Sequence, residues 1–276
     1  MRNCLVIVSD EHQSRAMGCA GHEFVSTPNL DALAKGGVRF SQFYNSGRCC
    51  PTRATLMTGL HPHEVGIGHM TQPPGSNRGE GRPPAYQGYL NRSCVIIAEA
   101  LEGHDYATLM AGKWHLGNQG HWPTDQGFDI NIGGHHRGSP PGGYYSPWNN
   151  PVLKSKKKDE YLTERLTEES TRFLEKRDAD KPFLLYLSYY NIHTPIQPYR
   201  KHIDHYQKKA EGFSGTTPTE QEHSAQTRMR QDNPALASMV SAVDDSVGTL
   251  LAKLDELGLS GDTVVIFFSD NGGLST

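Results

Sequence analysis

The residues best suited to chemistry lie in one short segment, 47–59, which reads Gly-Arg-Cys-Cys-Pro-Thr-Arg-Ala-Thr-Leu-Met-Thr-Gly. Pro51 suits the first turn of a helix, and Gly59 stands where a helix would end in a left-handed cap. Cys49 would then lie at the N-terminal mouth of the helix, with Arg53 one turn further in. Free backbone N–H groups and the helix dipole favour an anion at such a mouth. The segment therefore predicts a nucleophile beside a cation and an anion-binding position.

Oxygen-bearing side chains follow two apolar runs, 3–8 and 263–268, at opposite ends of the chain. Each run closes in Ser followed by two such residues, which are Asp10 and Glu11 in the first case and Asp270 and Asn271 in the second. Because ligands bind at the carboxyl ends of strands in open α/β sheets, we expect these side chains to gather there. Their oxygens favour a hard cation, Ca²⁺ or Mg²⁺, over zinc. Each pair taken alone also suits an ordinary solvated turn.

Basic groups follow two further strands. Lys113 and His115 come after a strand predicted at 106–110, and alternation along an extended backbone places both on one side. The alternative is a surface Lys and His that flank a packed Trp. His193 follows the buried strand predicted at 182–190. A cation and two titratable rings could thus face the same edge of the sheet.

The elements that must position these residues alternate between strands and helices along the chain. We predict strands at 3–8, 38–44, 106–110, 182–190 and 263–268, and helices at 27–36, 49–59, 94–101, 161–177 and 235–257. Several strand runs are apolar throughout, which is typical of a parallel sheet buried on both faces. Residues 1–276 are therefore expected to form an α/β domain with a mostly parallel central sheet between helices.

Composition excludes several classes of protein. The chain has 276 residues, of which 36% are hydrophobic and 21% charged, as is ordinary for a globular domain. A net charge of −3 gives no reason to expect nucleic-acid binding. No apolar stretch approaches the length needed to cross a bilayer, so no membrane contact is expected. The five cysteines form no C-x-x-C pair, which argues against a disulfide framework and a structural zinc site.

These motifs resemble those of the type I, formylglycine-dependent sulfatases, in the alkaline phosphatase superfamily. Residues 49–53, Cys-Cys-Pro-Thr-Arg, are similar to the family's Cys-x-Pro-x-Arg signature, and 112–115 are similar to its Gly-Lys-x-His element. The resemblance implies an alkaline-phosphatase/sulfatase-like fold and a sulfuric ester hydrolase, arylsulfatase-like, that cleaves aryl or carbohydrate sulfate monoesters. It also implies a formylglycine-generating enzyme as partner, which converts Cys49 to Cα-formylglycine, and a bound divalent ion, Ca²⁺ or else Mg²⁺.

The resemblance also assigns roles to the candidate residues. Arg53 would hold the modified side chain, Lys113 would bind a sulfate oxygen and His115 would take up a proton. His193 would stabilise or protonate the leaving oxygen. The implied metal ligands are Asp10, Glu11, Asp270, Asn271 and the modified Cys49. Glu11 stands where the family commonly has a second Asp.

Two other functions fit the same motifs. One is a phosphonate monoester or phosphodiester hydrolase of the same superfamily, and the other is an inactive, truncated binder of sulfated glycans. Because family members continue beyond the second metal pair, we expect residues 1–276 to be the N-terminal portion of the catalytic domain, without its C-terminal part and subdomain. Such a chain would expose a sheet edge and show weak or no activity alone. The protein would be periplasmic or secreted if a leader precedes Met1, and cytoplasmic otherwise.

Overall fold

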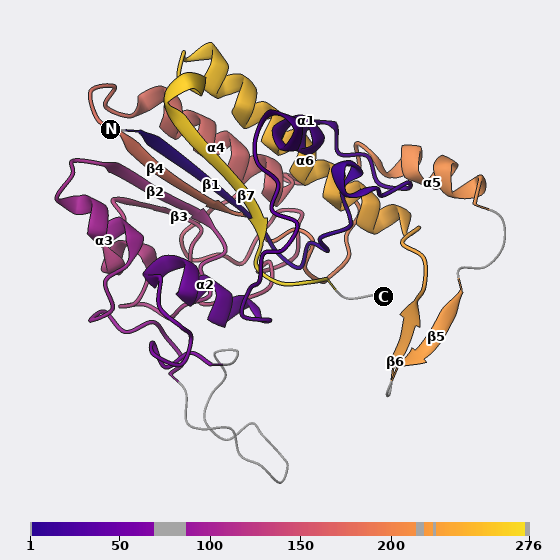
Figure 1. Ribbon diagram of the computed structural model, residues 1–276, viewed down its shortest axis with the longest axis horizontal. Helices are drawn as coiled ribbons and strands as arrows, with labels where there is room; N and C mark the ends of the chain where they lie inside the picture. The colour runs from indigo at the N-terminus through magenta and orange to yellow at the C-terminus, as the bar shows by residue number, and fades with distance from the viewer. Residues whose placement is uncertain (1, 69–86, 214–217, 223–224, 274–276) are drawn as a thin grey trace, which may run out of the picture.

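A five-stranded sheet forms the centre of the molecule (Figure 1), in a computed structural model that describes residues 2–68, 87–213, 218–222 and 225–273. The strand order is β3-β2-β4-β1-β7, with β1 at Asn3–Ser9, β2 at Ala107–Gly112, β3 at Ile130–Ile132, β4 at Phe183–Ser188 and β7 at Thr263–Ser269. Every pairing in this sheet is parallel. The carboxyl ends of the strands therefore meet at one edge, as the sequence predicts.

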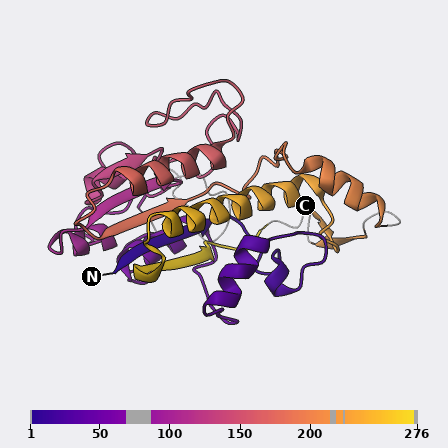
Figure 2. The same cartoon turned by 90° about the horizontal axis from the view of Figure 1, so that it is seen from above.

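Helices cover both faces of this sheet. The described helices are α1 (Pro28–Gly36), α2 (Cys49–Thr58), α3 (Ile97–Glu102), α4 (Leu162–Lys176), α5 (Ile203–Glu211) and α6 (Pro234–Glu256). Leu5 and Ile7 of β1 share one apolar cluster with α4 and α6, whereas Val6 and Val8 share another with α2 and α3. Figure 2 shows α4 and α6 side by side along the sheet. The alternation of β1 side chains between two clusters confirms the predicted sheet between helices.

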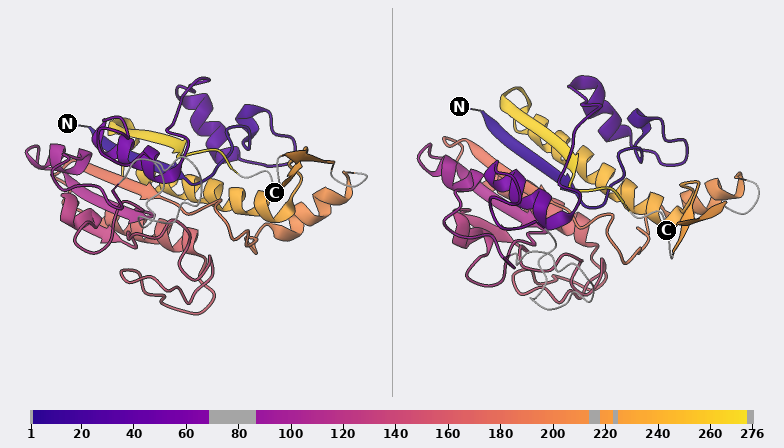
Figure 3. Two further views of the ribbon diagram at one scale, coloured as in Figure 1. Left: turned by 90° about the horizontal axis from the view of Figure 1, so that it is seen from below. Right: turned by 60° about the horizontal axis from the view of Figure 1, so that its bottom comes forward.

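Four of the five predicted strands are confirmed as β1, β2, β4 and β7, and the five predicted helices as α1, α2, α3, α4 and α6. The short strand β3, the helix α5 and the antiparallel pair β5 (Thr219–Glu222) and β6 (Ala225–Arg228) were not predicted. Three 3₁₀ turns, η1 (Gly18–Ala20), η2 (Pro123–Gln126) and η3 (Ser260–Asp262), complete the described elements. The views in Figure 3 show the β5–β6 pair beyond the end of the central sheet.

The prediction of a strand at 38–44 was wrong. These residues form no strand, and Tyr44 is 86% exposed. The ring of Phe43 lies 6.4 Å from that of Phe268 on β7, so the segment touches the sheet with one aromatic side chain. Aromatic and β-branched residues favour a strand only where a neighbouring strand satisfies their backbone groups, and the described residues supply none here.

Strand β7 is the last strand of the sheet, with β1 as its partner among the described residues. Val264 and Ile266 are 43% and 44% exposed on the face that carries Val6 and Val8 of β1. An apolar surface therefore remains open beside β7.

Helix α6 corrects one sequence-based expectation. Its 23 residues are long and apolar enough to span a bilayer, contrary to the prediction that no stretch is, yet 67% of the apolar window is buried against the rest of the protein. Its position among α1, α4 and α5 is that of a core helix. Asp244 of the same helix is 2% exposed and accepts N–H groups of Asn29 and Leu30 at the start of α1. That contact ties α1 to α6.

Candidate active site

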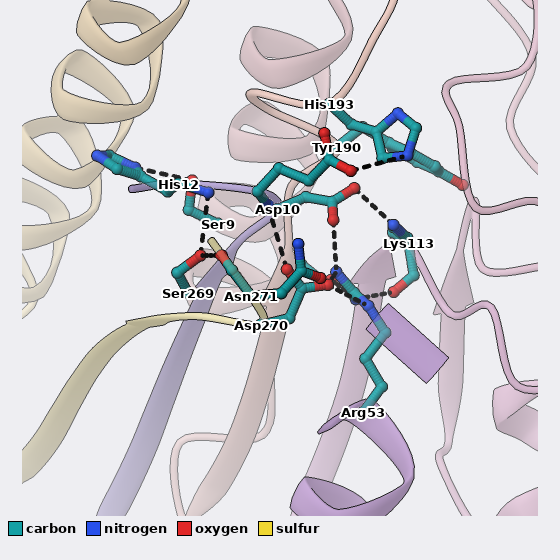
Figure 4. Close-up of polar contacts among 12 residues, drawn as sticks. Ser9, Asp10, His12, Arg53, Lys113, Tyr190, His193, Ser269, Asp270 and Asn271 are labelled. Carbon is teal, nitrogen blue, oxygen red and sulfur yellow. Dashed lines mark hydrogen bonds and ion pairs between the residues drawn. The ribbon is translucent and has the colours of Figure 1, made fainter. Parts of the chain in front are cut away.

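The carboxyl ends of β1 and β7 and the first turn of α2 enclose one buried cluster of side chains (Figure 4). Asp10 and Asp270 directly follow the two strands, which pair in register up to their final serines. Cys49 is the first residue of α2. Ligand atoms of Asp10, Cys49 and Asp270 all lie within 4.8 Å of one another, and all three residues are buried. The structure thus brings together three residues that are separated by at least 39 positions in the sequence.

Within this cluster, Arg53 connects α2 by hydrogen bonds to the carboxyl ends of β2, β4 and β7. Its Nε and Nη2 donate to Asp270 Oδ2 at 3.0 and 2.8 Å. Its Nη1 donates to the Lys113 carbonyl at 2.8 Å and to the hydroxyl of Ser188 at the end of β4. Nη2 also lies 3.8 Å from Asp10 Oδ1. With 2% exposure, the guanidinium is a fully buried cation held by charge-assisted hydrogen bonds.

Lys113 enters the cluster from the end of β2. Its Nζ lies 2.6 Å from Asp10 Oδ2, and both side chains are fully buried. The chain turns sharply just before it, at Gly112, whose φ is +98°. A Cβ on Gly112 would lie 1.9 Å from the carbonyl oxygen of Ser188, so only glycine fits between the two strands. This turn directs the ammonium group toward Asp10.

The two carboxylates of the cluster have opposite pKa shifts. Burial, together with the charge of Asp270, raises the pKa of Asp10 well above its ordinary value despite Lys113 and Arg53. Burial also acts to raise the pKa of Asp270, but Arg53 and Lys113 outweigh it and the pKa is lowered. Burial raises the pKa of the Cys49 thiol to about 12. As a cysteine, residue 49 is therefore protonated at neutral pH and a poor nucleophile.

Glu11 does not belong to the three-residue group. Its Oε1 lies 3.5 Å from His193 Nε2, and its backbone N–H donates to Asp270 Oδ1 at 3.2 Å. The residue has a φ of +55°, a left-handed conformation, so the chain turns directly after Asp10. Asn271 is also buried, and its Oδ1 has no hydrogen-bond partner within the described parts of the chain. The structure thus places Asn271 at the cluster and directs Glu11 toward His193.

The two predicted histidines differ in their contacts. Burial, then the charges of Lys113 and Arg53, lower the pKa of His115 well below its ordinary value. The pKa of His193 is lowered by burial and Lys113, whereas Glu11 acts to raise it. Nδ1 of His193 lies 2.8 Å from the Thr194 carbonyl oxygen. Both rings are therefore mainly neutral at pH 7 and can accept a proton.

Three serines and a histidine that were not among the predicted site residues support the cluster. His12 is 2% exposed; its ring contacts Ser9 Oγ at 3.0 Å, and its backbone N–H donates to Ser269 Oγ at 3.0 Å. Ser188 accepts from Arg53, as described above. Each of these serines ends a strand at the same edge of the sheet. That shared position is the sequence signal that could have identified Ser188.

The donor set fits a hard cation. Oδ1 of Asp10 and Oδ1 of Asn271 are both buried without a hydrogen-bond partner in the described residues, although buried polar atoms are normally paired. Carboxylate and amide oxygens suit Ca²⁺ or Mg²⁺, whereas the soft sulfur of Cys49 does not. Arg53 and Lys113 add two buried positive charges beside these oxygens. The arrangement can hold a tetrahedral oxyanion and stabilise charge that develops on it.

The chain is similar to known sulfatases in sequence and in fold. The family model described as Sulfatase matches residues 2–275. Human arylsulfatase A is 30% identical over 98% of this chain and 52% of its own length, and an uncharacterised sulfatase of Schizosaccharomyces pombe is 29% identical over 98% and 57%. The crystal structure of Ps i-CgsB in complex with k-i-k-neocarrahexaose is 29% identical, with a TM-score of 0.76 over 99% of this chain and 59% of that one. The chain thus spans about half the length of the curated relatives it matches.

Proposed function

Since the chain belongs to the sulfatase family, we propose that this protein hydrolyses sulfate monoesters of aryl or carbohydrate alcohols, with Cys49 as the position of the nucleophile. The observation that carries the proposal is the convergence of Arg53 and Lys113 on the buried group of Asp10, Cys49 and Asp270. A sulfate ester develops negative charge on oxygen as its bond to the alcohol breaks. Two fixed, buried cations suit that charge distribution.

Conversion of Cys49 to Cα-formylglycine is part of the proposal. The buried thiol, with its pKa raised to about 12, is chemically inert at neutral pH. Oxidation to the aldehyde, which forms a hydrate in water, would replace the sulfur by oxygen nucleophiles beside the same cations. A formylglycine-generating enzyme is accordingly the proposed maturation partner.

Asp10, Asp270 and Asn271 would hold the divalent cation, most simply Ca²⁺, with Mg²⁺ as the alternative. The two buried oxygens that lack a hydrogen-bond partner in the described residues, Oδ1 of Asp10 and Oδ1 of Asn271, support this assignment. Glu11 would join them through its longer side chain, after turning away from His193. A bound divalent ion supplies positive charge that favours the deprotonated form of an oxygen nucleophile.

The remaining residues bind the substrate and move protons. Lys113 would release Asp10 in part and donate to a sulfate oxygen, while Arg53 keeps its position through Asp270 and Ser188. His115, whose pKa is lowered well below its ordinary value, is neutral and can accept a proton. His193 lies beside Glu11 and, in its protonated form, would donate a proton to the departing alcohol oxygen.

The test uses the polypeptide as its source organism makes it, produced with and without a formylglycine-generating enzyme. We expect the matured protein to hydrolyse 4-nitrophenyl sulfate faster than an aryl phosphonate, and we expect Cys49→Ala to abolish the reaction. Mass spectrometry of the Cys49 peptide should show a loss of about 18 Da. EDTA should stop turnover, and added Ca²⁺ or Mg²⁺ should restore it. Faster cleavage of the phosphonate would support the alternative hydrolase, and an unconverted thiol with retained glycan binding would support a non-catalytic binder.

A further inference from the structure

The imidazole of His115 lies directly against the backbone at Gly138. A Cβ at position 138 would lie 2.2 Å from Cε1 of the ring and 2.7 Å from each of its two nitrogens. Packed interiors do not accommodate such distances without movement of one partner. The φ of Gly138 lies outside the left-handed region, so the backbone conformation does not itself require glycine there. The close approach of the ring does.

The loop that carries Gly138 is held at fixed points. Asn131 Oδ1 accepts the Gly134 N–H at 2.8 Å, and its Nδ2 donates to the Gly134 carbonyl at 2.9 Å. The ring of His135 accepts the Arg137 N–H at 3.2 Å. The same loop accepts from the backbone of His115, whose N–H donates to the His135 carbonyl at 3.0 Å. The backbones of loop and histidine are therefore tied together, so a side chain at position 138 would be accommodated by rotation of the ring and not by separation of the two backbones.

The orientation of the His115 ring needs such a constraint. Its Nδ1 is buried and has no hydrogen-bond partner in the described parts of the chain. Its backbone has a φ of +59°, in the left-handed region. Catalytic imidazoles are usually oriented by a hydrogen bond to the nitrogen that does not react. In this protein, contact between the ring and the loop backbone at Gly138 orients the imidazole instead of such a hydrogen bond.

We infer that Gly138 is a positioning residue for His115: by leaving no side chain between loop and ring, it sets the rotation of the imidazole. This inference rests on the proposed function, in which His115 accepts a proton. A methyl group at position 138 would turn the ring and misalign the accepting nitrogen. Displacement of a catalytic group by about 1 Å can reduce a rate by roughly a hundred-fold.

The variant Gly138→Ala tests the inference in the matured, full polypeptide with 4-nitrophenyl sulfate. We expect kcat to fall by about ten-fold or more, with KM within about two-fold of the wild type. The matched control is Gly103→Ala, because a Cβ at Gly103 meets nothing within 4 Å. In a His115→Ala background, Gly138→Ala should change kcat by less than about two-fold, since no ring remains to be displaced. An equal loss in both backgrounds, or no loss in either, would overturn the inference.

A second measurement separates this inference from the proposed function. Absence of sulfate ester hydrolysis in the wild type would refute the proposed function. The His115 ring is then followed by ¹H–¹³C NMR, with its signals identified from His115→Ala. Gly138→Ala should shift these signals and Gly103→Ala should not; unshifted signals in Gly138→Ala would overturn the inference. If Gly138→Ala does not fold, His115→Ala/Gly138→Ala should, because the clash is gone, and failure of the double variant to fold would also overturn it.

Discussion

Replacement of Arg53 by Met should destabilise the folded chain strongly. Arg53 donates twice to Asp270 Oδ2 and twice more to the Lys113 carbonyl and the Ser188 hydroxyl, all in the interior. Methionine fills a similar volume but leaves the Asp270 carboxylate with little compensation. Removal of one partner from a buried ion pair costs about 3 to 5 kcal/mol. For a chain of this length the loss corresponds to a fall in Tm of about 5 to 10 °C.

The assay is urea and thermal unfolding of Arg53→Met, with Arg92→Met as control because Arg92 is exposed. The double variant Arg53→Met/Asp270→Asn removes the unpaired charge as well. It should recover about 1 to 3 kcal/mol relative to the sum of the two single losses. A cost below about 1 kcal/mol for Arg53→Met, or strict additivity in the double variant, would refute the view that the buried pair governs stability here.

The effect should also depend on pH in a defined direction. In the wild type the pKa of Asp270 is lowered on folding, so its contribution to stability is present at neutral pH and is lost as pH falls through that lowered pKa. In Arg53→Met the main cation is absent and the pKa of Asp270 rises. Protonation then relieves the unpaired charge. The stability deficit of the variant should therefore be larger at pH 7 than at pH 4, and a deficit that grows toward pH 4 would contradict this.

Three further predictions follow from the site. Burial lowers the pKa of His115 well below its ordinary value, so the acid-side decline of kcat in a pH–rate profile should begin only below about pH 6.5, the ordinary pKa of histidine. An acid-side decline that begins above about pH 6.5 would contradict the assignment of His115 as proton acceptor. Glu11→Gln removes a charge that raises the pKa of His193, so an NMR titration of that ring should show a lower pKa; an unchanged value would mean that the two side chains do not interact in solution. Unconverted Cys49, with its thiol pKa raised to about 12, should resist iodoacetamide at pH 8 in the folded chain and react once the chain is unfolded in urea; rapid modification of the folded chain, read by peptide mass, would disprove its burial.

The sheet and the gathering of acidic residues were predictable because each depends on local signals. Fully apolar runs indicate strands buried on both faces, and two runs that close in Ser-Asp point to neighbouring strand ends. The structure pairs those runs in register, from Asn3 opposite Thr263 to Ser9 opposite Ser269. The left-handed cap at Gly59 is likewise present, with a φ of +69°. Where the pattern and its physical cause lie within a few residues, the sequence was sufficient.

Contacts between distant residues were not predictable in the same way. Nothing local distinguishes a segment such as 38–44, which has β-forming residues but no partner strand, from a true strand. Asp244 looks like an exposed helix residue until the start of α1 is placed against it. Glu11 follows Asp10 directly, yet its backbone conformation turns its carboxylate toward His193. In each case the outcome depends on which other element packs against the residue.

Among the described residues β7 pairs on one side only, and in a chain limited to these residues the site would open more readily than the rest of the sheet. Asp270 and Asn271 extend from β7, and β1 alone pairs with that strand among the described residues. Edge elements open with lower free energy than central ones, so β7 can detach while β2, β4 and β1 stay paired. Such local opening would separate Asp270 from Arg53 and halve the oxygen donor set in one step. The rate of hydrogen exchange at the amides of β7 would then report on how often the site opens. A ligand that bridges β7 to α2 would slow exchange at the amides of both elements.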